Sequence, residues 1–173
     1  MGQLIIGAVG RDRPGLVGEL TGKLFEAGAN LADTRMVNLR GEFALLLLVE
    51  GTQDTLDRLR VELPATASAM GLTLLVADHG DEVSPLKGMP FRLKTNSMDQ
   101  PGIVHRVSEL LAGHGVNIEE LSTRQESGPF MGAPLFTMEV RLTVPLGVKV
   151  KTLRADLIAL CDSLNCDADL EPA

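Results

Sequence analysis

A six-residue motif that occurs twice is the feature that most constrains how this chain can fold. Asp12-Arg13-Pro14-Gly15-Leu16-Val17 returns as Asp99-Gln100-Pro101-Gly102-Ile103-Val104, an interval of 87 positions. Further identical pairs keep this interval: Gly28 with Gly115, and Asn30 with Asn117. Self-similarity at a fixed interval is the sequence signature of a repeated structural unit. We therefore expect two copies of one small domain within the 173 residues.

The interval between the copies changes further along the chain. Phe43 aligns with Phe136, 93 positions later, so the second copy carries six additional residues. These fall in the segment 125–134, whose glycines and prolines predict a loop. A polar stretch separates the copies. We predict a first domain at 1–80, a linker at 81–90 and a second domain at 91–173.

Hydrophobic periodicity predicts the same order of elements in each copy. Residues 4–9 form an apolar run of strand length, and residues 91–96 alternate as a half-buried strand does. Each motif is followed by apolar residues at helical spacing, such as Leu16, Leu20 and Leu24. Two strands, a second helix and a last strand follow, with Pro64 threatening to break the second helix of the first copy. The predicted class is α+β: two ferredoxin-like βαββαβ domains, each an antiparallel four-stranded sheet with two helices on one face.

The motif set resembles the ACT domain, a small-ligand module of amino-acid metabolism. The resemblance lies in a strand, Asp-x-Pro-Gly-(Leu/Ile)-Val, a helix and Gly-x-Asn-(Leu/Ile), present in both copies. Tandem ACT domains with no catalytic domain attached resemble amino-acid-responsive transcriptional repressors of this family. The resemblance implies a small ligand such as glycine or serine, and regulation through a partner activator protein.

The chemistry of the turn suits a zwitterionic amino acid. Proline presets the backbone for a helix start, and glycine lets a ligand approach the main chain. Unpaired N–H groups at a helix start can receive a carboxylate. An aspartate would accept from the ammonium group, and an asparagine would bond either end. The candidate ligand-binding residues are Asp12, Pro14, Gly15, Leu16, Val17 and Asn30 in the first copy, and Asp99, Pro101, Gly102, Ile103, Val104 and Asn117 in the second.

A structural role is the alternative for these residues. Aspartate before a helix is commonly an N-cap, and Gly-x-Asn after a helix is commonly a turn. We expect the second copy to hold the better site, because Asp99 and Asn117 lie beside the segment 125–134, which has the length of a lid. His105 lies next to this turn, where it contacts either a ligand or water.

Charge excludes a large class of functions. The chain has 16 Lys+Arg against 23 Asp+Glu, a net charge of −7, with no Trp or Tyr. Direct binding to duplex DNA usually needs a basic patch, and single strands need aromatic stacking platforms. We therefore expect no nucleic-acid binding. No apolar run is long enough for a membrane span, and the two cysteines, Cys161 and Cys166, form no disulfide framework. We expect a cytoplasmic protein.

Catalytic and metal chemistry find no support in the residue pattern. Cys161 and Cys166 are predicted to be buried small hydrophobes, and the three histidines are not spaced as a metal set. We expect a regulator that is not an enzyme and needs no cofactor. Two alternatives stay open: a pure interaction and dimerisation module without a ligand, and a small cofactor-free isomerase or hydrolase.

The outward faces of the two predicted sheets differ. The first carries Ile5, Gly7, Ala44, Leu46 and Leu48, and the second carries Arg92, Lys94, Thr137, Glu139 and Arg141. An apolar outer face is unusual for a sheet in water, so we expect a second chain or another domain to cover it. We favour a homodimer through the first domain.

Overall fold

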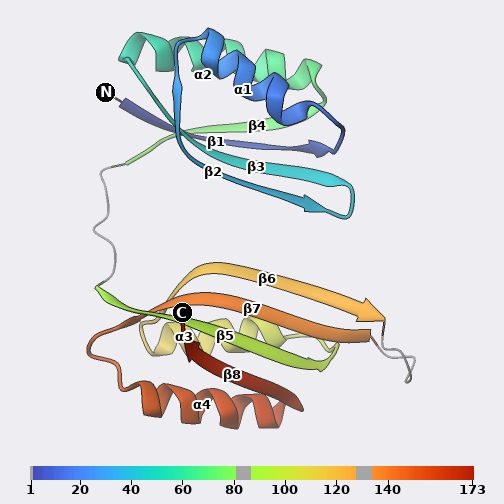
Figure 1. The fold of residues 1–173 in the computed structure, drawn as a ribbon, viewed down its shortest axis with the longest axis vertical. Helices are drawn as coiled ribbons and strands as arrows, with labels where there is room; N and C mark the ends of the chain where they lie inside the picture. Colours follow the sequence, from blue (N-terminus) through green and yellow to red (C-terminus); the bar gives the residue numbers. More distant parts are fainter. Residues whose placement is uncertain (1, 81–86, 128–133) are drawn as a thin grey trace. The chain divides into compact units, whose positions relative to one another are not determined.

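The chain forms two compact units, Met1–Val83 and Ser84–Ala173. The computed structural model describes residues 2–80, 87–127 and 134–173. Each unit contains its elements in the order βαββαβ, with two helices over one face of its own sheet (Figure 1). The predicted ferredoxin-like class and the duplication are confirmed.

The first unit runs from strand to strand with short connections. Its elements are β1 (Gly2–Arg11), α1 (Leu16–Glu26), β2 (Asn30–Leu39), β3 (Glu42–Gly51), α2 (Gln53–Ala69) and β4 (Leu72–Asp78). Helix α1 ends where predicted, because Gly28 adopts a left-handed φ of 81° and its N–H donates to the Phe25 carbonyl. Helix α2 continues through Pro64 without a break.

The second unit repeats this order. Its elements are β5 (Gly88–Met98), α3 (Ile103–Gly113), β6 (Asn117–Ser127), β7 (Pro134–Pro145), α4 (Val150–Ser163) and β8 (Cys166–Pro172). Strand β5 begins inside the segment 81–90 that we predicted as linker. Gly88 extends the strand because it pairs with Pro145, and a side chain there would collide with the Val144 carbonyl.

Both sheets are antiparallel and have the same strand order, β2-β3-β1-β4 and β6-β7-β5-β8. The middle strands pair over their full length, Gly2 with Gly51 through Arg11 with Glu42 in the first unit. The prediction of a loop over 125–134 is partly wrong. Residues 125–127 belong to β6 and pair with β7, because the hairpin strands are longer than the apolar pattern suggested. The remainder, 128–133, lies outside the described residues.

Alternating side chains build each core. In the first unit Leu4, Ile6 and Ala8 of β1 are fully buried beneath Leu20 and its neighbours on the helices. The matching residues of the second unit include Leu93, Val107 and Leu157. Burial of this kind supplies about 25 cal/mol per Å² of apolar surface. Within the described parts of the chain, no helix is long and apolar enough to cross a membrane.

Two polar side chains interrupt the second core. Thr95 and Ser97 point inward from β5, and neither hydroxyl has a hydrogen-bond partner among the described residues. The repeat places Ala8 and Gly10 at these positions in the first unit. A buried hydroxyl without a partner costs about 1–3 kcal/mol.

Replacing the buried hydroxyl should stabilise the protein. We expect Thr95→Val to raise the free energy of unfolding by about 1 kcal/mol, since the methyl group fills the same volume without a desolvation cost. Chemical denaturation would measure it. Thr137→Val is the matched control, because the Thr137 hydroxyl is exposed and donates to Asn96. A clear loss of stability in Thr95→Val would mean that a buried partner for the hydroxyl exists.

Candidate functional site

The turns between β1 and α1 and between β5 and α3 share an unusual backbone. Gly15 and Gly102 precede the two helices with φ of 94° and 97°, a left-handed conformation that favours glycine. No side chain caps either helix. The alternative in which the motif aspartate is the N-cap is therefore wrong: in both helices the N-cap is glycine, and in α1 the Leu16 N–H donates only a long bond of 3.5 Å to the Arg13 carbonyl.

The motif aspartates instead hold the turn against the neighbouring hairpin. Asp12 accepts a hydrogen bond from the Asn38 side chain, and Asp99 accepts one from Gln125 at 2.7 Å. Our sequence analysis missed both amide partners. The repeat offered a signal, because Asn38 and Gln125 are also 87 positions apart. This bond fixes each turn on the end of the sheet.

In the first unit, an internal ion pair covers the turn. The Arg13 guanidinium donates to both carboxylate oxygens of Glu19, at 2.5 and 2.7 Å. The carboxylate lies so close that a Cβ built on Gly15 would be 3.3 Å from Glu19 Oε1. These hydrogen bonds lower the pKa of Glu19 below its ordinary value of 4.5. A negative charge from the chain itself therefore lies beside the start of α1.

In the second unit, the equivalent turn is open. Arg106 stands at the position of Glu19, and Gln100 stands at the position of Arg13. The Gln100 amide turns away and donates to the Leu164 carbonyl at the end of α4. A Cβ on Gly102 would meet no atom within 4 Å. A hollow of about 400 Å³ lies here, lined by Gln100, Gly102, Ile103, Val104, His105 and Phe136.

The two asparagines lie at the other ends of the helices. Asn30 and Asn117 begin β2 and β6, directly after α1 and α3. Each of these helices has 11 residues, so its ends are about 16 Å apart. Within one unit, the structure therefore does not bring the asparagine to the aspartate and glycine of the turn. Asn117 donates to Glu119, and Asn30 borders a separate hollow beside Gly18 and Gly22.

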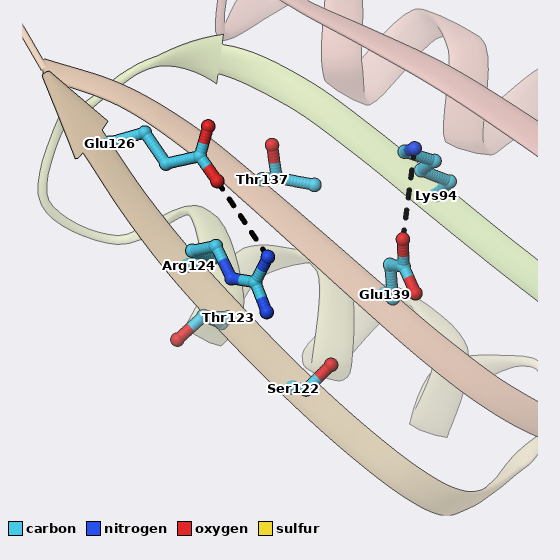
Figure 2. A pocket seen from close by; sticks show the side chains of 7 residues that line it. All are labelled: Lys94, Ser122, Thr123, Arg124, Glu126, Thr137 and Glu139. Carbon is cyan, nitrogen blue, oxygen red and sulfur yellow. Dashed lines mark ion pairs between the residues drawn. The ribbon is translucent and has the colours of Figure 1, made fainter. Parts of the chain in front are cut away.

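A polar trough lies on the outward face of the second sheet. It has a volume of about 480 Å³ and is lined by Lys94, Ser122, Thr123, Arg124, Glu126, Thr137 and Glu139. Figure 2 shows two ion pairs in it, Lys94 with Glu139 between neighbouring strands and Arg124 with Glu126 along β6, at 3.6 and 3.7 Å. Cations and anions alternate over this face, so it is suited to water.

The cysteines are buried. Cys161 and Cys166 are free thiols in one apolar cluster with Leu164. Burial, reinforced by the neighbouring Cys166, raises the pKa of Cys161 to about 12. The Cys161 thiol therefore stays protonated near neutral pH and is a poor nucleophile. Across residues 2–80, 87–127 and 134–173, no three His, Cys, Asp or Glu side chains are grouped to hold a metal ion.

Comparison with known proteins identifies the family. The family model for the ACT domain matches residues 2–77. By this match, the first unit belongs to the ACT-domain family. The second unit repeats the motif and the strand order of the first, so the chain is a tandem ACT-domain protein.

Similar proteins extend over nearly the whole chain. The glycine cleavage system transcriptional repressor of Escherichia coli is 24% identical over 167 residues, covering 96% of this chain and 88% of the relative. A UPF0237 protein of Methanopyrus kandleri is 31% identical over 83 residues, 47% of this chain and 91% of the relative. A crystal structure of an unknown protein from Galdieria sulphuraria is 28% identical, with a TM-score of 0.85 and coverage of 99% and 98%. The tandem ACT domains and the similarity to a repressor support a regulatory role.

The ion pair over the first turn should respond to pH. Because the pKa of Glu19 is lowered in the folded protein, the pair persists above pH 4.5 and is lost as the pH falls through the lowered value. NMR of the side-chain carboxyl carbon should find the titration midpoint of Glu19 below pH 4.5, and Arg13→Gln should raise that midpoint. Lys23→Gln, which removes the partner of Glu26, is the control. A midpoint unaffected by Arg13→Gln would contradict this assignment.

Proposed function

We propose that the chain is a non-catalytic regulator that binds a small amino acid at the turn between β5 and α3. The ligand would be glycine, serine or a similar molecule. The observation that carries this proposal is the open turn of the second unit, where the hollow of about 400 Å³ adjoins the uncapped start of α3. The equivalent place in the first unit is covered by Glu19.

The chemistry of this hollow supports a zwitterion. The N–H groups of Ile103 and Val104, at the positive end of the α3 dipole, would receive the ligand carboxylate. Asp99 does not line the hollow but precedes Gln100, which does. Gln125 donates to Asp99 Oδ2, so we propose that Oδ1 accepts from the ligand ammonium. Phe136 and the apolar lining leave room for a short side chain. Asn117 lies at the other end of α3, so we assign it no direct contact within this unit.

We propose that a partner activator protein recognises the ligand-bound state and controls transcription of genes for amino-acid metabolism. A chain with net charge −7 is unsuited to holding DNA phosphates itself. The similarity to a glycine cleavage system transcriptional repressor over 96% of the chain supports this role. We further propose that the protein acts in the cytoplasm as a homodimer.

The first unit fits a different role. The Arg13–Glu19 pair over its turn favours the alternative of an interaction module without a ligand, for this unit alone. One sensing unit and one assembly unit would explain why the duplicated turns have diverged while both folds persist.

A matched pair of glycine variants would test the site. Gly102→Ala directs a methyl group into the open hollow, and Gly15→Ala imposes the same left-handed strain in the first unit. We expect isothermal titration calorimetry with the twenty amino acids to detect glycine or serine. The Kd should rise at least about tenfold in Gly102→Ala and stay within about twofold in Gly15→Ala. Equal losses in both variants, or no binding by the unaltered protein, would contradict the proposal.

A second experiment separates DNA binding from partner binding. We expect no sequence-selective gel shift with DNA at physiological salt, because phosphate neutralisation needs basic side chains that this acidic chain does not concentrate. Co-purification with a purified candidate activator protein should depend on the amino acid. A salt-resistant, sequence-selective shift by the chain alone would overturn this part of the proposal.

A further inference from the structure

We infer that the outward face of the first sheet is a self-association surface, on which the same face of a second copy of this chain packs. The surface is formed chiefly by Ile5, Val9, Val37, Leu46, Leu48 and Leu75. This inference names the interface of the proposed homodimer. It does not depend on amino-acid binding, because the proposed ligand site lies on the other unit.

The register of the sheet places these side chains together. Gly7 pairs with Leu46 on one side and Leu75 on the other, and Val9 and Ile5 lie two residues away on the same face. The helices cover the opposite face, where Leu4, Ile6 and Ala8 are buried (Figure 1). Val9, Leu46 and Leu75 are instead 53%, 49% and 65% exposed. One unit thus leaves a contiguous apolar patch in contact with water.

Small residues make the patch continuous. A Cβ built on Gly7 would lie 3.6 Å from Leu75 Cβ and 3.9 Å from Leu46 Cδ1. The two leucines therefore stand on either side of the space above Gly7 and contribute to one surface. Sheets that pack face to face in proteins use such interdigitating apolar side chains at a separation of about 10 Å.

Charges lie at the ends of this face and on its edge strand, and most of them are paired within it. Arg11 pairs with Glu42 at one end, and Glu50 accepts a hydrogen bond from Gln3 at the other end, at 2.8 Å. Arg35 pairs with Asp33 on the edge strand. An isologous, two-fold arrangement of identical faces is the commonest symmetry of soluble dimers.

The size of the face fits a dimer. Four strands of 7 to 10 residues give a sheet about 19 Å wide and about 30 Å long. Two such faces would bury about 1,100 Å² together, which exceeds the area of about 1,000 Å² expected of a biological interface. A small molecule would leave most of this area uncovered.

The other sheet of the chain is a poor partner for this face. The Lys94–Glu139 pair and the Arg141–Glu120 pair lie on its outward side. The Lys94–Glu139 pair joins the two middle strands, β5 and β7, whereas the ion pairs of the first sheet lie at its end and on its edge strand. Packing apolar side chains over the middle of the second sheet would remove the Lys94–Glu139 pair from water without new partners, at a high desolvation cost. A second copy of the first sheet is therefore the better occupant than the second unit of the same chain.

Charged substitutions on the full-length chain test this inference. Leu46→Asp would place two carboxylates in each dimer interface, so we expect the Kd of self-association to rise about 100-fold or more. Light scattering should show a mass of twice 18.5 kDa for the unaltered protein and a shift to 18.5 kDa for Leu46→Asp. Thr137→Asp, on the outward face of the second sheet, and Val61→Asp, at an exposed apolar position of α2, are the controls and should remain dimeric.

Cross-linking keeps the inference testable if Leu46→Asp misfolds. Leu46→Cys should be joined into a dimer by a short bismaleimide, and Thr137→Cys should not, because the native cysteines are buried. A monomeric unaltered protein, or a dimer that Leu46→Asp leaves intact, would overturn the inference. Reduced thermal stability of Leu46→Asp at unchanged mass would assign the face to the second unit instead. Calorimetry on Leu46→Asp should still detect binding of the amino acid. A failure of the dimer inference is therefore distinguishable from a failure of the proposed ligand site.

Discussion

Two helices cover only one face of a four-stranded sheet, and most properties of this protein follow from that constraint. Strand residues alternate between faces, so each of the two units has an inner face that must be apolar and an outer face that is free to vary. The inner faces match at Leu4 and Ile6, which correspond to Phe91 and Leu93 at the repeat interval, and differ where Thr95 and Ser97 replace Ala8 and Gly10. The outer faces have diverged, one toward apolar residues and one toward ion pairs. The two units therefore share one fold but present outer faces of different chemistry.

The turns show the same division between preserved and altered features. Left-handed glycines, the aspartate and its amide partner recur in both units, because the turn geometry requires them. The side chains around the turn are not required by the geometry. Glu19 and Arg13 form a pair over one helix start, while Arg106 and Gln100 leave the other open. Two differences, Glu19 against Arg106 and Arg13 against Gln100, thus change which groups surround the start of the helix.

The sequence predicted the fold well because the repeat and the alternation both report directly on it. The strands were underestimated at their ends, as at residues 125–127, where pairing with β7 continues beyond the apolar pattern. The candidate site was predicted only in part. Gly102, Ile103 and Val104 do line one hollow, but Asn117 was grouped with them from its position in the motif, although a helix of about 16 Å separates them. Hydrogen bonds between distant residues, such as Asp99 with Gln125, carry no periodic signal of their own.

The bond from Gln100 to the Leu164 carbonyl links residues 64 positions apart. Leu164 caps α4, and the next residue, Asn165, turns into β8 with a left-handed φ of 48°. Strand β8 is an edge strand of its sheet. A ligand that recruited the Gln100 amide would take a donor away from this corner, and the Leu164 carbonyl would have to find another. The open turn and the edge of the sheet thus share one amide group, so a ligand bound at the proposed site would have a direct physical route to the start of β8.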